Sequence, residues 1–537
     1  MAIRARWGLG MLLSLSIVLT LVLLVPAPEA AVGAAATAMP AHAASQGSSG
    51  STCSIAYNLP GDIGNFGSDP PDQEDLDIYS WQLFLALNAP GVGQSVSTTG
   101  DNWTQWGGSA SQPITTSHPG FSSTDDLLQQ VTSTSVPAYG AHYYPHACTQ
   151  IPGYQSYRVV DELDKVDDSF FEASVGSLST SPAIATNSSF IRYEILISPV
   201  TYGTIVKNQW YLTSVLNAQT SSLSFPCGTE SGGGRTASPA DEGVGPITIK
   251  NAWMDASGID ASDYHTEKLL VFSPAEENNS RQDTCELKTM ALVGMHIAHK
   301  TAQQPGWTWS TFEHRANAPD CTNTPPPPDP QKKTPVSQNM ACPSAGGTYN
   351  FFPQNTGNPS YQTCNTTPAG NAPQNSTCDD GFCADLQPNA AAGYSRLCRQ
   401  VPLQANYPTA YAQTQACNTA TKSGVWSNYS LVSTQWFTTF SSAQKSTCQN
   451  VATTVSPLTN SQSFAPQVKM SDGKTFIPYL ANTALESYER SVCLGCHQGA
   501  AVTKGGTIST DLMYFLQLEV PAAPINQGNQ TSPRRSR

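Results

Sequence analysis

Fourteen cysteines spread along 537 residues restrict the fold of this chain more than any other feature of its sequence. Two of them, Cys493 and Cys496, lie in one short motif near the C-terminal end. The other twelve can form at most six disulfide bonds, and an even number in an exported chain favours disulfides over metal-bound thiolates. They are Cys53, Cys148, Cys227, Cys285, Cys321, Cys342, Cys364, Cys378, Cys383, Cys398, Cys417 and Cys448. The sequence does not define their pairing.

The N-terminal segment has the pattern of a secretory signal. Arg4 and Arg6 precede an uncharged, mostly apolar run over 9–25, and small residues follow as far as Ala41-His42-Ala43. We therefore expect residues 1–44 to be a cleaved signal peptide and the mature protein to be exported, to the periplasm or the extracellular space. The alternative is an uncleaved anchor, because the apolar run is nearly long enough to span a bilayer. We expect no membrane span in the mature chain.

Composition narrows the fold class and the partners. Charged residues make up only 12% of the chain and hydrophobic residues 39%, which does not suit a coiled coil or a helical bundle. The formal net charge is −13, and an acidic chain without a basic patch is a poor ligand for nucleic acid. We expect no nucleic-acid partner.

Hydrophobic periodicity predicts one early helix followed by a β-rich stretch. Apolar spacing predicts a helix over 74–88. Strands are predicted over 190–199, 202–206, 246–253 and 268–273. Residues 288–301 and 307–315, separated by Gln304-Pro305-Gly306, predict a hairpin. The segment 423–438 is expected to return to the core.

Near the C-terminus the pattern becomes helical. Thr483-Ala484-Leu485-Glu486 has the form of a capping box and predicts a helix as far as about Ser491. Residues 511–520 predict a second short helix.

The motif Cys493-Leu494-Gly495-Cys496-His497 is C-x-x-C-H, the attachment signature of c-type haem. Its two thiols add to the two vinyl groups on one porphyrin edge, and the adjacent histidine ligates the iron. We expect one covalent haem c, bound by Cys493, Cys496 and His497, with His497 as the proximal ligand of the iron. The motif has three alternative interpretations. A redox dithiol would need a βαβ context, and a zinc site would need a second pair of ligands nearby. A disulfide between Cys493 and Cys496 would be strained.

The fold that these patterns predict is α+β. It has a β-rich main body with irregular disulfide-linked loops and a small C-terminal helical haem-attachment segment. The expected divisions are a signal peptide (1–44), a β-rich N-terminal domain (45–320), a Cys/Pro-rich insertion (321–400), a C-terminal c-type haem region (401–520) and a disordered tail (521–537).

The distal side of the iron has three candidate ligands, Met513, His296 and His299. A methionine would raise the reduction potential and a histidine would lower it. Met513 has an alternative role as an apolar core residue that packs beside Leu512 and Phe515. His296 and His299 point to opposite faces of a strand, so they cannot both face one haem.

The same hairpin offers the candidates for distal acid/base chemistry, His299, His314 and Glu313. Each histidine has an ordinary alternative as a hydrogen-bonded structural residue. The neighbouring aromatic residues Trp307, Trp309 and Phe312 would form an apolar wall of the kind that packs against haem.

Four segments together resemble a group of large exported bacterial proteins of the cytochrome c family. They are 81–88 (WQLFLALN), 292–301 with 307–314 (LVGMHIAHKT and WTWSTFEH), 424–436 and 480–497, which ends in the haem motif. The resemblance implies haem binding and electron transfer, and it adds no defined substrate.

Electron transfer with a redox partner protein is the function that these observations favour. One haem needs on the order of a hundred residues, the scale of one domain, and this chain is several times longer. Two alternatives therefore stay open. One is a haem-dependent oxidoreductase of peroxidase or oxidase type, acting on a small-molecule substrate bound by the β-rich domain. The other is a redox sensor, gas sensor or binding module that contains haem.

Overall fold

The structure is a computed structural model of the whole chain. It describes residues 60, 62–63, 73–88, 121–128, 135–160, 174–175, 189–228, 243–273, 282–319, 349–351, 424–438, 440, 448, 464–465, 468–469, 475–476, 482–485, 493–497, 500–502, 506–518 and 520. The expected signal peptide and C-terminal tail, and all of the expected insertion except 349–351, lie outside these residues.

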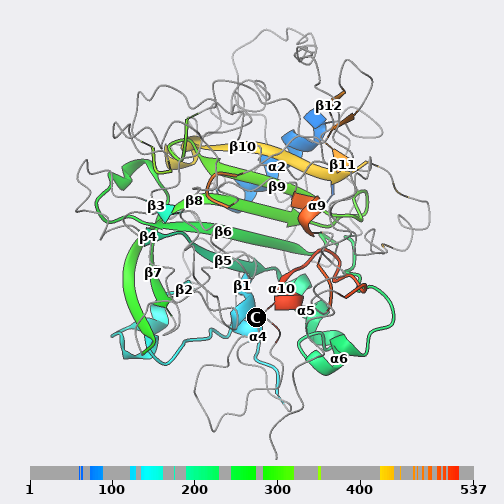
Figure 1. Cartoon of the computed structure of the whole chain (residues 1–537), viewed down its shortest axis with the longest axis horizontal. Helices are drawn as coiled ribbons and strands as arrows, with labels where there is room; N and C mark the ends of the chain where they lie inside the picture. Colours follow the sequence, from blue (N-terminus) through cyan, green and yellow to red (C-terminus); the bar gives the residue numbers. More distant parts are fainter. Residues whose placement is uncertain are drawn as a thin grey trace, which may run out of the picture. The chain divides into compact units, whose positions relative to one another are not determined.

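A nine-stranded, curled sheet forms the β-rich body that the hydrophobic periodicity predicts (Figure 1). Its main path runs β1-β5-β6-β8-β9-β10-β11, with β7 beside β8 and β2 beside β7. The strands are β1 (Ser122–Ser123), β2 (Val159–Val160), β5 (Arg192–Ile197), β6 (Ile247–Asp255), β7 (Thr266–Ser273), β8 (Thr284–His299), β9 (Thr308–His314), β10 (Tyr429–Phe437) and β11 (Phe464–Ala465). Neighbours pair antiparallel except β2 and β7. Two further strand pairs are β3 (Ser174–Val175) with β4 (Ser189–Phe190), and β12 (Val468–Lys469) with β13 (Thr475–Phe476).

The predicted hairpin is confirmed as β8 and β9. Ala298 pairs with Trp309 and His296 with Thr311, and β10 adds on the far side of β9, with Gln435 opposite Trp309. Every residue of β10 is buried, so the segment 423–438 does return to the core. Strands that precede residue 320 and a strand that follows residue 401 therefore share one sheet.

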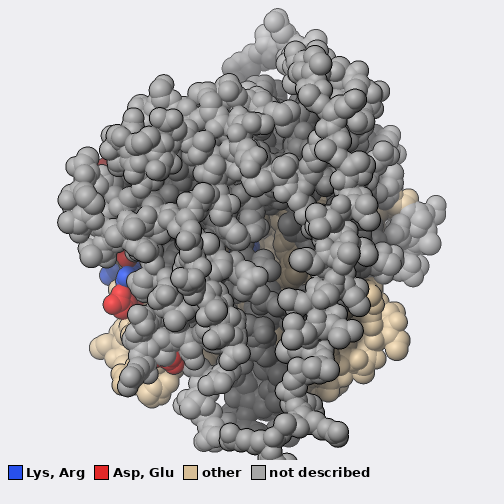
Figure 2. Space-filling model, in the orientation of Figure 1, with Lys and Arg blue, Asp and Glu red and all other residues tan. Residues whose placement is uncertain are grey.

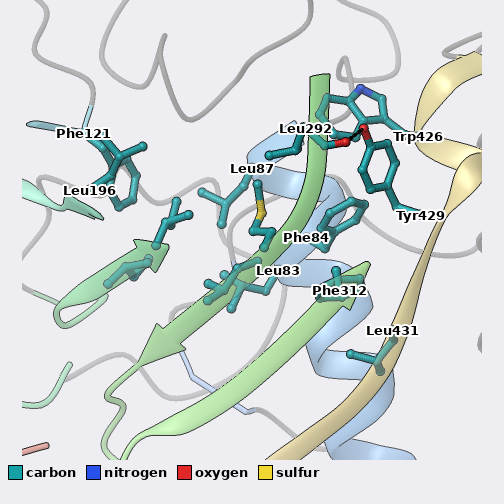
Figure 3. Packing of buried hydrophobic residues seen from close by; sticks show 14 of the residues in the cluster. Leu83, Phe84, Leu87, Phe121, Leu196, Leu292, Phe312, Trp426, Tyr429 and Leu431 are labelled. Atoms are coloured by element: carbon teal, nitrogen blue, oxygen red, sulfur yellow. Dashed lines mark hydrogen bonds between the residues drawn. The ribbon is translucent and has the colours of Figure 1, made fainter. Parts of the chain in front are cut away.

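Helix α2 (Gln73–Asn88) covers one face of this sheet, where the sequence predicts a helix. Leu83, Phe84 and Leu87 point toward the strands, and the rings of Phe84 and Phe312 stack with centroids 4.2 Å apart (Figure 3). The Ser80 hydroxyl lies 2.7 Å from the hydroxyls of both Ser310 and Thr434. Apolar packing and this short hydroxyl network fix α2 over β9 and β10.

The opposite face of the sheet is covered by C-terminal segments. A Cβ at Gly294 of β8 would lie 3.0 Å from Asn482 Oδ1 and 3.1 Å from the Ala484 Cβ, so the glycine leaves room for this segment to approach closely. The Asn482 amide donates to the carbonyl of Phe312, at 2.7 Å. The helices α9 (Cys493–His497) and α10 (Phe515–Leu518) also belong to the C-terminal part.

The strand predicted over 202–206 is wrong, because this segment lies in helix α5 (Pro199–Lys207). Ser198 caps the helix by accepting from the Thr201 amide at 3.3 Å, and Pro199 at the first position carries the backbone angle that a helix start needs. These two residues outweigh the β-branched content of the segment. Two further short helices are α4 (Thr124–Leu128) and α6 (Thr213–Asn217).

The C-terminal helices differ from the prediction where the chain is described. Residues 483–485 form a turn, and the Thr483 hydroxyl donates to Glu313, while 486–492 lie outside the described residues. The second helix, described over Phe515–Leu518, begins later than predicted because Asp511 and Leu512 have positive φ angles of 56° and 72°. Left-handed backbone of this kind cannot continue a right-handed helix.

Two disulfide bonds join distant parts of the described chain. Cys148 pairs with Cys285 of β8, and Cys227 pairs with Cys448, across 137 and 221 residues of sequence. These confirm disulfide bonding for four of the twelve cysteines, and the other eight lie outside the described residues. Within the described part of the chain, no helix has the length and apolar character needed to cross a bilayer. In Figure 2, uncharged residues form most of the described surface, in keeping with the low content of charged residues.

Candidate functional site

The C-x-x-C-H motif occupies the single turn of helix α9, which packs against β10 (Figure 1). The backbone amide of Leu494 in this turn donates to Gln435 Oε1 of β10, at 3.1 Å. Cys493 is buried and belongs to an apolar cluster with Leu494 and Trp309. The sheet thus anchors the start of the motif, while the side chain of Cys496 lies outside the described residues.

The imidazole of His497 is held by a backbone carbonyl. Its Nδ1 lies 2.7 Å from the Leu512 carbonyl oxygen, which can only accept, so Nδ1 carries the proton. In the neutral ring Nε2 then bears the lone pair, which is the form that ligates a metal. The ring packs on Trp309, with centroids 4.1 Å apart, and on Tyr514, at 5.2 Å.

His296 lies on the same face of the sheet as His497, with Trp309 in contact with both. The Trp309 indole Nε1 lies 3.5 Å from His296 Nδ1, at the long end of a hydrogen bond, and the ring centroids are 6.5 Å apart. His296 is 5% exposed. Of the three candidate histidines of the hairpin, His296 is the one that the structure brings to the side of the motif.

His299 lies on the opposite face, beside α2, as the alternation of β8 predicts. The Tyr79 hydroxyl bonds to Nδ1, and Nε2 lies 2.7 Å from the carbonyl of Val244. Complete burial lowers the pKa of His299 to about 4. Both ring nitrogens of His299 are therefore engaged away from the motif.

His314 and Glu313 have structural partners. His314 Nε2 lies 3.1 Å from the Asp263 carbonyl, its Nδ1 accepts from the Ala316 amide, and its ring stacks on Tyr264, with centroids 3.9 Å apart. Glu313 Oε2 accepts from both the amide and the hydroxyl of Thr483, at 2.8 and 2.7 Å. The candidate carboxylate thus ties β9 to the C-terminal segment.

Met513 is buried in the apolar cluster that contains Cys493 and Trp309. It follows Leu512, whose carbonyl accepts from His497, and its own carbonyl accepts from the Thr510 hydroxyl at 2.8 Å. A packing role is thus established for Met513.

Three features of this site were not predicted from the sequence. The Leu512 carbonyl and the Gln435 amide oxygen are acceptors that no motif marks. The third is a buried ion pair, in which Lys300 Nζ lies 2.5 Å from Asp511 Oδ2, next to the residue that contacts His497. Burial raises the pKa of Asp511 and lowers that of Lys300. An acidic residue inside the otherwise uncharged stretch 505–518 is the one signal that could have pointed to it.

These residues fit a covalently attached haem in their donor chemistry. Cys493 lies in an apolar cluster one helical turn from His497, and His497 is held in the tautomer that a metal ligand requires. In the described part of the chain, no three or more His, Cys, Asp or Glu side chains gather into a group that could hold a metal ion.

Comparison with known proteins adds no relative, since no protein-family model, no curated protein and no solved structure matches this chain.

Proposed function

We propose that this protein is an exported c-type cytochrome with one haem, which transfers single electrons to or from a redox partner protein. The observation that carries the proposal is the arrangement around His497. Its motif lies in one helical turn, and its Nδ1–H group donates a hydrogen bond to the Leu512 carbonyl. Export is supported by the two disulfide bonds, which persist in oxidising compartments.

In this proposal Cys493 and Cys496 hold the haem through thioether bonds and His497 is the proximal ligand. A bound haem supplies a one-electron iron centre whose potential depends on its axial ligands and their hydrogen bonds. The residues of this chain do the remaining work. Leu512 orients the imidazole, Trp309 and the apolar cluster exclude water from one side of it, and Gln435 fixes the turn that carries the cysteines.

For the sixth coordination position we retain His296 and Met513. Both are buried beside or within the apolar cluster on the His497 side of the sheet, whereas His299 lies on the other side. His314 and Glu313 are assigned structural roles, because their polar atoms bond to Asp263, Ala316 and Thr483. A haem-dependent oxidoreductase would require an open sixth position.

Visible spectra of the mature protein test the proposal. The protein is produced in a host with c-type maturation and compared when oxidised, reduced, and reduced under carbon monoxide. We expect haem that stays attached on denaturation, with attachment impaired in Cys493→Ala and retained in the matched control Cys148→Ala/Cys285→Ala. Wild-type protein without covalent haem would overturn the proposal.

The carbon monoxide spectrum separates the two haem functions. An unchanged spectrum indicates a six-coordinate iron and supports electron transfer, and His296→Ala and Met513→Ala then identify the sixth ligand by the variant that alters the spectrum. A spectrum that changes readily indicates an open position and favours the oxidoreductase.

A further inference from the structure

The carbonyl group that accepts from His497 belongs to a strained turn. Asp511 and Leu512 both have left-handed backbone, with φ angles of 56° and 72°, and neither is a glycine. Such backbone persists only where the surrounding contacts over-determine it, and it gathers at functional sites. Some other part of the molecule must therefore hold this turn.

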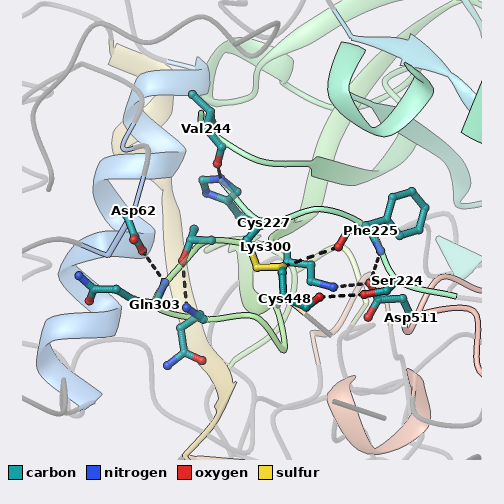
Figure 4. Close-up of a disulfide and its surroundings, with 12 residues drawn as sticks. Asp62, Ser224, Phe225, Cys227, Val244, Lys300, Gln303, Cys448 and Asp511 are labelled. Atoms are coloured by element: carbon teal, nitrogen blue, oxygen red, sulfur yellow. Dashed lines mark hydrogen bonds and ion pairs between the residues drawn. A yellow bond between two sulfur atoms is a disulfide. The ribbon is translucent and has the colours of Figure 1, made fainter. Parts of the chain in front are cut away.

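The Asp511 side chain makes the contacts that hold it (Figure 4). Asp511 Oδ2 accepts from Lys300 Nζ at 2.5 Å and from the Phe225 backbone amide at 2.8 Å. The Asp511 amide donates to the Ser509 hydroxyl at 3.1 Å. The carboxylate thus ties the turn to two segments that are distant in sequence.

Lys300 is itself fixed to the central sheet. It follows β8 directly, its backbone amide donates to the Pro246 carbonyl at 3.1 Å, and its ammonium group lies 5.9 Å from the centroid of the Trp307 ring. The side chains of Lys300 and Asp511 are 0% and 1% exposed. Removing two charges from water is costly, and apolar residues often replace such a pair without loss of stability, so stability alone is a weak reason for it.

We propose that Asp511, held by Lys300, is a positioning residue for His497. It fixes the turn so that the Leu512 carbonyl accepts a hydrogen bond from Nδ1, and this bond sets how strongly the imidazole donates to the haem iron. The inference rests on the proposed function for its effect on the iron. A strong Nδ1 hydrogen bond raises the basicity of the ligand and stabilises ferric over ferrous iron. Loss of the anchor therefore raises the reduction potential.

The test compares the haem protein with two variants, Asp511→Asn and Lys300→Met/Asp511→Asn. The double variant removes both charges together, so no buried charge is left unpaired if the single variant fails to fold. We expect the ratio of ferric to ferrous affinity to fall about tenfold, which for one electron is an upward shift of about 59 mV. The Nδ1 proton of His497, observed by NMR of protein with labelled histidine, should broaden or move upfield.

Lys288→Met is the matched control, because it breaks the Lys288–Asp255 ion pair of 3.1 Å on the same sheet. We expect it to leave both the potential and the Nδ1 signal unchanged. A double variant that keeps the wild-type potential and Nδ1 signal would overturn the inference, and so would an equal shift in Lys288→Met. Failure of both Asp511 variants to fold would also overturn it, since the turn would then serve the fold as a whole.

The two proposals fail in different ways. Wild-type protein without covalent haem contradicts the proposed function. The Nδ1 signal of His497 then still tests the positioning role, because it reports the Leu512 contact in haem-free protein. A signal that is insensitive to Asp511→Asn in that protein contradicts the inference alone.

Discussion

The hydroxyl of Tyr79, on α2, bonds to Nδ1 of His299, at the end of β8, across the interface between helix and sheet. The carbonyl of Val244 accepts from Nε2 on the other side of the ring, at 2.7 Å. The imidazole is therefore neutral with its proton on Nε2, and the Tyr79 hydroxyl donates to Nδ1. A second proton on the ring would place a charge in the core and take away the acceptor of the Tyr79 hydroxyl proton.

This arrangement predicts a loss of stability in acid. Burial lowers the pKa of His299 from 6.5 to about 4, so between these values the unfolded chain binds a proton that the folded protein does not. The free energy of unfolding should fall by about 2.5 kcal/mol between about pH 7.5 and about pH 4.5 through this residue, at about 1.36 kcal/mol per pKa unit. Urea denaturation across this range measures it.

The matched variant is His299→Gln, which keeps hydrogen-bonding capacity and removes the titration. We expect a lower stability at neutral pH and a pH dependence reduced by the same amount. His142 acts in the opposite sense, because its hydrogen bond to Asp126 raises its pKa and its stabilisation is lost as the pH rises through that value. The contribution of His142 is the same in wild type and variant, so it cancels when their pH dependences are compared. An unchanged pH dependence in His299→Gln would therefore show that His299 is not the cause of the acid destabilisation.

A second prediction concerns Gln435, the acceptor for the Leu494 amide. Gln435→Met preserves the length of the side chain and leaves that buried amide without its acceptor, which should cost about 1–3 kcal/mol. Because the contact holds the motif, a smaller fraction of the purified protein should also carry haem. Ser433→Ala on the same strand is the control, since the Ser433 hydroxyl bonds to the Thr434 carbonyl within β10. Equal haem content in Gln435→Met and wild type would show that β10 does not support the motif.

A third prediction separates structure from catalysis at Glu313. Thr483→Val removes one of the two hydrogen bonds that Glu313 accepts from Thr483, and it should lower the free energy of unfolding by about 1.5–3 kcal/mol, as for a bond to a charged group. The reduction potential should not change, because neither residue contacts His497 within the described structure. Thermal denaturation and potentiometry on the same samples measure both quantities.

The control for this variant is Thr308→Val, on β9, the strand that carries Glu313. The Thr308 hydroxyl is fully buried and has no hydrogen-bond partner among the described residues. Replacing it with a methyl group of the same shape should be neutral or stabilising. If Thr308→Val lowered the free energy of unfolding and Thr483→Val did not, the structural role of the Thr483–Glu313 bond would be contradicted.

The sequence predicts the helices and strands around the site better than it predicts the contacts within it. The helix over 74–88 and the hairpin of β8 and β9 are found because their hydrophobic spacing matches the geometry of the element that forms. The region 202–206 fails because a local helix cap at Ser198 outweighs residue preference. Haem attachment at Cys493 stays a prediction, which rests on residue types at fixed spacing in the sequence.

The contacts that orient the motif could not be predicted in the same way. Leu512 acts through its backbone carbonyl, which any residue type would supply. Gln435 lies 59 residues from Leu494, and Lys300 lies 211 residues from Asp511, so only the tertiary fold brings these groups together. Sequence alternation did place His296 and His299 on opposite faces, but the choice between them requires the position of α9.

The last prediction contrasts the two disulfide bonds found among the described residues. Each closes a long loop, of 137 and 221 residues, and removal of a native disulfide lowers stability by about 2–5 kcal/mol. Only the Cys227–Cys448 bond adjoins the Asp511 turn. Beside it the Ser224 hydroxyl donates to the Cys448 carbonyl at 2.8 Å, and the Phe225 amide donates to Asp511 (Figure 4).

Cys227→Ala/Cys448→Ala should therefore lower stability and also raise the reduction potential, because the segment that supports Asp511 is loosened. Cys148→Ala/Cys285→Ala should lower stability and leave the potential unchanged. Denaturation and potentiometry of the two variants make the comparison, and equal potentials would show that support of the turn does not pass through Phe225.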